Sequence, residues 1–272
     1  MTAISSTVKI KSKIPARSIA LPVEHGAWGF LFEPLFVGLI LAPSLAAPSL
    51  ALFVVGAFLT RQPLKFLIAD WRGKKRLPRT ALALKFALIF GGIAGFGLLG
   101  TLLFAPMQSL IPFVIVAPIV VYLIIQDAAR QSRELLPELL AAFALSSSVA
   151  ALALAGGFSI MFASVLWALM LARLIPSVLY VRSRLRLEKG KDFSQFGVIA
   201  AHVLALAIIG AFYYFGLSSL LTVLMAVFLT GRAAFGLSSF RRSMKAKAIG
   251  IREVIYGVLY ALTIVFGYYL NL

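Results

Sequence analysis

The sequence predicts an all-α, polytopic membrane protein with about nine transmembrane helices. Of its 272 residues, 61% are hydrophobic and only 13% are charged, and the mean hydropathy is +1.00. A soluble domain is about one quarter charged. The apolar residues form long runs between short charged or turn-rich segments, which is typical of a chain folded in a bilayer. Cysteine is absent, which excludes disulfides and thiolate metal sites.

The apolar runs are each about 17–24 residues long, enough to cross roughly 30 Å of hydrocarbon as a helix. The first 24 residues are basic and lack the apolar core of a signal peptide. We therefore expect residues 1–24 to form a cytoplasmic segment and residues 25–272 a single transmembrane helical domain. The helices are predicted over residues 26–46, 49–67, 86–104, 110–126, 137–155, 158–181, 196–215, 218–237 and 254–270.

The charges alternate between connections. There are 26 Lys and Arg against 9 Asp and Glu, for a net charge of +17. The connections after the second, fourth, sixth and eighth predicted helices are charged, and the other four carry no charge. By the positive-inside rule this pattern predicts a cytoplasmic N-terminus, an external C-terminus and every Lys and Arg on the cytoplasmic half of the membrane. It explains the basic composition without a nucleic-acid partner.

Charges inside apolar spans are costly and indicate function. Glu33 lies about two turns into the first helix, on one face with Gly26 and Gly29. Small residues mark packed helix faces in membranes, so Glu33 should point into the bundle. His25, at the membrane entry, could titrate or bind a ligand. We expect Glu33 and His25 to be catalytic; the alternative for Glu33 is a structural ion pair.

Further polar residues gather near the cytoplasmic ends of the helices. Arg61 and Lys65 are four residues apart in the second helix, and Asp70 follows. Lysine can instead snorkel toward headgroups. In the sixth helix the spacing of Arg173, Pro176, Ser177, Tyr180 and Arg184 predicts a polar stripe on one face. His202 is expected to be buried and bonded across helices.

The connection after the fourth helix mixes both signs of charge. A plain anchoring loop would need only basic residues, so its carboxylates suggest arginines held in position for a ligand. The alternative is a salt-bridge cluster within the loop. We assign ligand binding to its charged residues: Asp127, Arg130, Arg133, Glu134 and Glu138.

Every even-numbered predicted helix has an arginine in or just beyond its cytoplasmic end: Arg61, Arg130, Arg173 and Arg232. Guanidinium groups match phosphate and carboxylate oxygens bidentately. If these helices surround one cavity, the sequence predicts a cytoplasm-facing pocket for an anionic small molecule or lipid, phosphorylated or lipid-linked. The alternative is that these arginines bind the headgroups of membrane lipids around the perimeter. The sequence contains no recognised metal-binding motif, and it does not indicate a cofactor.

Two stretches resemble the YwiC-like family of bacterial membrane proteins. One runs from His25-Gly-Ala-Trp28 to Glu33-Pro34 and the other is Arg61-Gln-Pro63. The turn Arg133-Glu-Leu-Leu-Pro-Glu138 also fits this family. The resemblance covers most of the chain and implies a multi-pass protein of the bacterial cytoplasmic membrane, but it implies no reaction.

The helix layout is distantly similar to that of the UbiA superfamily of intramembrane prenyltransferases. That resemblance implies nine helices with a cytoplasm-facing pocket, and prenyltransferase-like chemistry if the protein is an enzyme. UbiA enzymes hold Mg²⁺ and a prenyl diphosphate with two Asp-rich motifs. Here the two corresponding connections contain only Asp70 and Asp192, and single carboxylates hold Mg²⁺–diphosphate poorly.

Three functions stay open at this point. The first is a UbiA-like binding protein or transferase for an anionic lipid-type substrate. The second is a transporter or permease in which Glu33 and the arginines form the path of the substrate or of protons. This hypothesis fits less well, because the charges cluster near one face of the membrane rather than at its midplane. The third is a non-catalytic accessory membrane subunit.

Overall fold

The computed structural model describes residues 15–22, 25–74, 77–129 and 131–270. Within these residues every regular element is helical and no strand occurs. The elements, in chain order, are α1 (Ala16–Ala20), α2 (His25–Leu41), α3 (Ala47–Arg72), α4 (Pro78–Phe104), the 3₁₀ turn η1 (Met107–Leu110), α5 (Ile111–Ala128), α6 (Leu135–Ala155), α7 (Ile160–Glu188), α8 (Gln195–Tyr214), α9 (Leu220–Leu237) and α10 (Ala246–Leu270).

The predicted membrane class is confirmed by the lengths and composition of these helices. In the described part of the chain, eight segments, from α3 to α10, are long and apolar enough to cross a membrane. The apolar part of α2, Gly26–Leu41, is shorter. The protein is thus an all-α, polytopic membrane protein of about nine helices, as predicted.

The helix ends differ from the predicted ends in an informative way. α2 ends at Leu41 rather than at residue 46. Pro43 follows the end of this helix, and Ala47 begins the next one. α7 continues to Glu188 and α10 begins at Ala246, so each adds about two turns at its charged end. Basic and acidic residues that the sequence placed in loops therefore project from helices, where their positions are fixed by the helix repeat.

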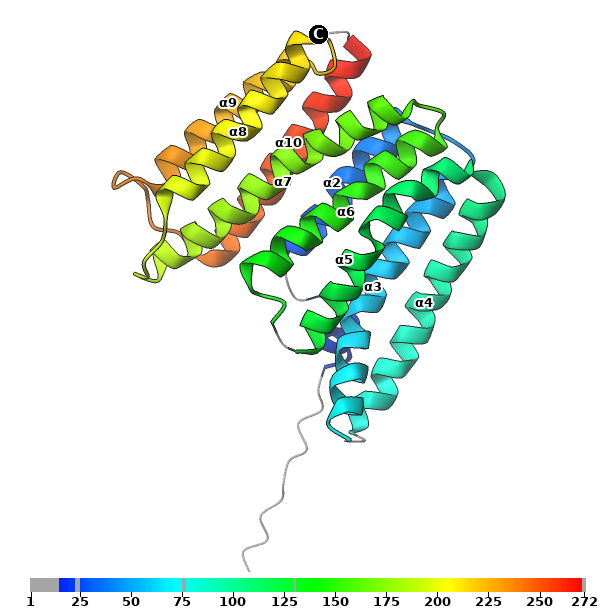
Figure 1. Ribbon diagram of the computed structural model, residues 1–272. Helices are drawn as coiled ribbons and strands as arrows, with labels where there is room; N and C mark the ends of the chain where they lie inside the picture. Colours follow the sequence, from blue (N-terminus) through cyan, green and yellow to red (C-terminus); the bar gives the residue numbers. More distant parts are fainter. Residues whose placement is uncertain (1–14, 23–24, 75–76, 130, 271–272) are drawn as a thin grey trace, which may run out of the picture.

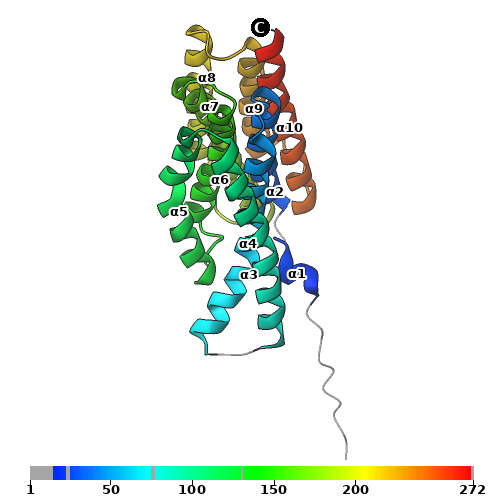
Figure 2. The same ribbon diagram turned by 90° about the vertical axis from the view of Figure 1, so that its right-hand side faces the viewer.

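Successive helices from α2 to α10 run up and down, as Figure 1 shows. The connections with charged residues lie at the lower and left ends of the helices in that view, and the uncharged turns lie at the opposite ends, near the C-terminus. Figure 2 shows that α3 and α4 extend furthest toward the charged end, with α1 beside them.

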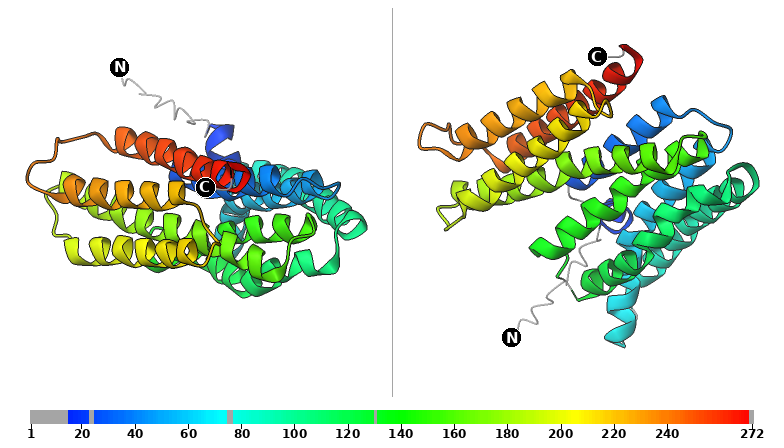
Figure 3. Two further views of the ribbon diagram at one scale, coloured as in Figure 1. Left: turned by 90° about the horizontal axis from the view of Figure 1, so that it is seen from above. Right: turned by 45° about the horizontal axis from the view of Figure 1, so that its top comes forward.

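Two groups of helices meet along α2, α6 and α7. α3, α4 and α5 lie on one side, and α8, α9 and α10 lie on the other (Figure 3). α2 packs against α6 and α10, and α6 packs against both α5 and α7. The larger apolar core joins α2, α6, α7, α8, α9 and α10 around buried residues such as Val37, Met170 and Ile264, and a second core joins α2, α3 and α6.

The α3–α4 pair approaches most closely at two glycines. A Cβ atom on Gly97 would overlap the backbone of Phe53, and one on Gly56 would overlap the backbone of Ala94. Small residues allow membrane helices to pack backbone to backbone in this way. The outer face of α4 is largely uncovered by protein, as expected of a helix that faces lipid.

Candidate functional site

A pocket of about 680 Å³ lies between α2, α6, α7 and α10. Its size is in the range of pockets that bind small-molecule ligands. The lining residues come only from the charged-end halves of these helices, such as Gly26 to Glu33 of α2 and Pro137 to Leu145 of α6. Arg61 of α3 and residues of the α5–α6 and α7–α8 connections complete the wall. The pocket therefore reaches from the charged end about halfway into the bundle.

Basic side chains dominate the pocket lining. Eight basic and three acidic residues are among the described residues that line it. The acidic residues are Glu33, Glu138 and Glu253. The basic residues are Arg61, Arg133, Arg173, Arg182, Arg186, Lys189, Lys191 and Lys247. Arg61 and Arg173 lie near the middle of α3 and α7, and the other six lie near the charged ends of helices or in the adjoining connections. We call these six the basic mouth: Arg133, Arg182, Arg186, Lys189, Lys191 and Lys247.

The wall between the mouth and the inner end is partly apolar. Phe30, Leu145, Val178 and Val254 contribute apolar side chains from four different helices. An apolar wall below a basic rim suits a ligand with a charged end and a hydrocarbon part, because each part then meets matching surroundings.

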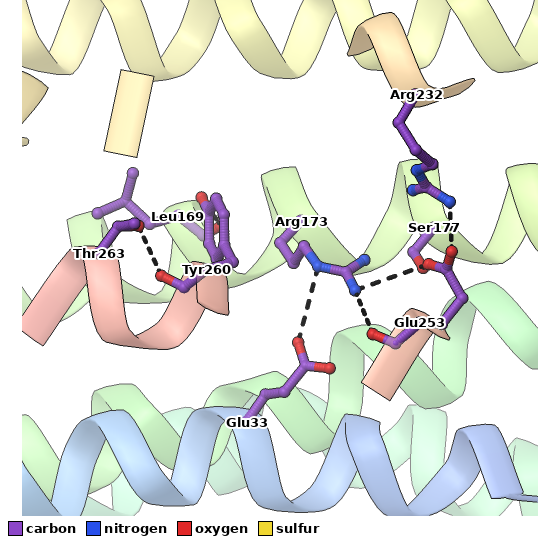
Figure 4. Close-up of polar contacts among 8 residues, drawn as sticks. All are labelled: Glu33, Leu169, Arg173, Ser177, Arg232, Glu253, Tyr260 and Thr263. Atoms are coloured by element: carbon purple, nitrogen blue, oxygen red, sulfur yellow. Dashed lines mark hydrogen bonds and ion pairs between the residues drawn. The ribbon is translucent and has the colours of Figure 1, made fainter. Parts of the chain in front are cut away.

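The inner end of the pocket contains a buried ionic network centred on Arg173 and Glu253 (Figure 4). The Arg173 side chain is only 2% exposed. Its Nη2 donates to the Glu253 carbonyl oxygen at 2.9 Å and lies 3.6 Å from Glu253 Oε2, and its Nε lies 4.0 Å from Glu33 Oε2. Ser177 Oγ donates to Glu253 Oε2 at 2.5 Å, and Arg232 Nη1 donates to Oε1. Glu253 thereby joins α10 to both α7 and α9.

Aromatic rings complete the network on the side away from the pocket. The Arg232 guanidinium lies 3.9 Å from the centre of the Tyr180 ring and 5.1 Å from that of Tyr256. Such stacking stabilises a partly desolvated cation. Deeper in the bundle, Tyr260 Oη donates to the Leu169 carbonyl oxygen at 2.9 Å and ties α10 to α7 again (Figure 4).

Arg61 and Asp127 form a bidentate pair between α3 and α5. Arg61 Nε donates to Asp127 Oδ2, and Nη2 donates to Oδ1 at 2.9 Å. Next to this pair, Lys65 Nζ donates to Ser132 Oγ at 3.5 Å. The structure thus brings three predicted site residues, Arg61, Lys65 and Asp127, to one corner, and of these Arg61 also lines the pocket.

The charged α5–α6 connection also meets α7. Arg182 Nη1 donates to the Arg133 carbonyl oxygen at 2.8 Å and to Glu138 Oε2 at 3.2 Å. Arg133 and Glu138 both line the pocket. Glu134 is exposed at the start of α6 and is not among the lining residues.

Other predicted site residues lie away from the pocket lining. Asp70 accepts from Arg79 Nη2 at 2.5 Å and from Thr80 Oγ1 at 2.7 Å, at the far end of the α3–α4 pair. Tyr180 and Arg232 belong to the α7–α9 contact. The predicted stripe on α7 is therefore divided, because Arg173 and Ser177 reach the pocket whereas Tyr180 packs toward α9. Arg130 and the side chain of His25 lie outside the described residues.

His202 is buried, as expected, but it bonds within its own helix. Its Nδ1 lies 2.8 Å from the Val198 carbonyl oxygen, one turn earlier in α8. The expectation of a bond across helices is wrong for this ring nitrogen, whose partner is the carbonyl oxygen one turn back in the same helix.

Glu253 is the member of the buried network that the sequence analysis missed, and Arg182, Arg186, Lys189, Lys191 and Lys247 of the basic mouth were not predicted as site residues either. Glu253 lies one residue before the apolar run predicted for the last helix, so it read as part of a basic loop. One available signal was the scarcity of acidic residues, of which the chain has only 9. A second was its spacing of four residues from Gly257, which places both on one face if the helix begins earlier.

Comparison with known proteins supports one of the two resemblances. A model of the family described as YwiC-like protein matches residues 21–153. This range contains α2, with Glu33, and the turn from Arg133 to Glu138. No curated protein and no solved structure matches the chain. The resemblance to the YwiC-like family predicted from the sequence motifs is thus confirmed over residues 21–153.

Proposed function

We propose that this protein binds an anionic, phosphorylated or lipid-linked ligand in the pocket between α2, α6, α7 and α10. The observation that carries the proposal is the excess of basic over acidic side chains around a pocket of ligand size. Arginine forks and lysine ammonium groups favour phosphate and carboxylate oxygens. The apolar wall formed by Phe30, Leu145 and Val254 supports a ligand with a hydrocarbon part.

The proposed orientation places the basic mouth in the cytoplasm of a bacterial cell. The charged connections gather at the mouth end of the helices and the uncharged turns at the other end (Figure 1). Cytoplasmic loops of membrane proteins are enriched in Lys and Arg. The proposed ligand therefore enters from the cytoplasm or from the cytoplasmic leaflet, whose anionic lipids are themselves candidates.

Binding is favoured over transport and over UbiA-like prenyl transfer by two features of the bundle. The pocket lining ends at the buried network of Arg173 and Glu253, about halfway along the helices, rather than continuing to the uncharged end. In addition, Asp70 accepts hydrogen bonds from Arg79 and Thr80 and is not among the pocket residues. The carboxylate at the position of the first UbiA Asp-rich motif is therefore engaged away from the proposed ligand.

The proposal can be tested with undecyl phosphate as a probe, titrated calorimetrically into the protein in neutral detergent. Lys247→Glu reverses a charge that lines the pocket, whereas Lys245→Glu reverses an exposed charge two residues away that does not. A charge near an anionic ligand contributes on the order of 1 kcal/mol, and reversal changes the charge by two units. The Kd should therefore rise about thirtyfold in Lys247→Glu only. Equal effects of the two variants, or no binding by the unaltered protein, would contradict the proposal.

A further inference from the structure

The inner end of the pocket holds an unmatched donor and acceptor that face each other. Glu33 Oε2 and Arg173 Nε are 4.0 Å apart, which is too far for a hydrogen bond. Both atoms are buried, and neither has a hydrogen-bond partner in the described part of the chain. Buried polar atoms without a hydrogen-bond partner cost free energy and are rare in native proteins. A ligand atom that bonded both of these atoms would remove that cost.

The two side chains are held apart by their other contacts. Arg173 Nη2 is bound to the carbonyl oxygen of Glu253 on α10. The Glu33 carboxylate packs against Gly257 of α10. It occupies the space that a Cβ atom on Gly257 would need. A Cβ atom on Gly29, one turn earlier in α2, would also lie only 3.3 Å from Glu33 Oε1. The gap is therefore set by the crossing of α2, α7 and α10 and not by a freely chosen rotamer.

Only certain chemical groups suit this gap. An oxygen between the two side chains must accept from Arg173 Nε–H and donate to Glu33 Oε2. A hydroxyl group does both, because it has one donor and two acceptor lone pairs. Phosphate or carboxylate would be repelled by Glu33, and an ammonium group would face the Arg173 guanidinium. A hydroxyl oxygen about 2.8 Å from each atom, set to one side of the line that joins them, would complete both hydrogen bonds across the 4.0 Å gap.

Both residues of the gap line the same pocket as the basic mouth. Arg182, at the mouth, is nine residues beyond Arg173 along α7, which corresponds to roughly 13 Å at 1.5 Å per residue. We infer that the ligand carries a hydroxyl group that binds between Glu33 and Arg173, with its anionic group roughly that distance away at the basic mouth. This inference rests on the proposed function. It adds that the ligand has a hydroxyl group and how far that group lies from the anionic group.

The test compares two phosphates with equal numbers of heavy atoms, ω-hydroxydecyl phosphate and undecyl phosphate, by the same titration. A site built to bond a hydroxyl discriminates strongly against an analogue without it. We expect the unaltered protein to bind the hydroxylated probe at least tenfold more tightly. Glu33→Leu should abolish this preference, whereas Lys247→Glu should weaken both probes alike and preserve it.

The outcomes separate the inference from the proposed function. If both phosphates bind, depend on Lys247 and have equal affinities, the pocket binds anions but the hydroxyl site is overturned. If neither binds, the proposed function itself fails. Should Glu33→Leu not fold, the comparison on the unaltered protein still decides, because equal affinities there contradict the inference.

Discussion

At the scale of single residues, Glu253 is the side chain on which the buried network depends. Its carboxylate accepts from Ser177 and Arg232 and lies beside Arg173, and its carbonyl oxygen also accepts from Arg173. Two guanidinium groups in an apolar bundle thus share one carboxylate, with Glu33 as the next acidic group. Removing one member of a buried ionic cluster leaves the others charged and desolvated.

We therefore expect Glu253→Gln to destabilise the protein strongly, by about 3–5 kcal/mol. The measurement is the thermal unfolding of purified protein in detergent, followed by tryptophan fluorescence. Glu134→Gln is the matched control, because Glu134 is exposed at the start of α6. Unfolding of Glu253→Gln at the temperature of the control would show that the network contributes little.

At the scale of helices, the crossing of α2 and α10 depends on a glycine. A Cβ atom on Gly257 would overlap the carboxylate of Glu33 on α2. Since a buried carboxylate cannot simply move into the apolar surroundings, a side chain here must displace either Glu33 or the helix itself. The same crossing sets the gap between Glu33 and Arg173, so helix packing and site geometry are linked.

Gly257→Ala should therefore cost about 1–3 kcal/mol, the usual range for overpacking. Gly231→Ala is the control in α9, where a Cβ atom meets nothing within 4 Å. That control should be neutral or stabilise its helix by up to about 1 kcal/mol, because alanine has the higher helix propensity. Both can be compared in the same thermal assay. Equal unfolding temperatures would mean that α2 and α10 have room to separate at this point.

At the scale of the whole molecule, charge distribution and helix direction agree. Four charged connections meet at one end of the bundle and four uncharged turns at the other (Figure 1). The basic mouth is built from this charged end. The residues that would orient the protein in the membrane are thus also those that would attract an anionic ligand, and the orientation decides from which side that ligand comes.

The orientation can be measured with introduced cysteines, because the chain has none of its own. Leu45, between α2 and α3, is 87% exposed, and Phe240, between α9 and α10, is 83% exposed. We expect a membrane-impermeant maleimide to label Leu45→Cys in intact bacterial cells, and to label Phe240→Cys only after permeabilisation. The reverse pattern would place the basic mouth outside the cell and contradict the proposed cytoplasmic entry.

Sequence alone was enough to predict the membrane class and about nine helices, because bilayer thickness demands apolar runs of a set length. It also singled out Glu33, Arg61, Arg173 and Arg232, since charges inside such runs are costly and conspicuous. These predictions need only the local pattern of residues.

Tertiary structure alone decided how these charges are paired. Arg61 takes Asp127 as its partner, Arg232 takes Glu253, and Glu33 and Arg173 remain 4.0 Å apart. Glu253 stayed hidden in the sequence because a residue at the end of an apolar run looks like part of a loop until the helix is seen to begin at Ala246. Pairing depends on which helices cross and at what height, and those contacts join residues far apart in the chain.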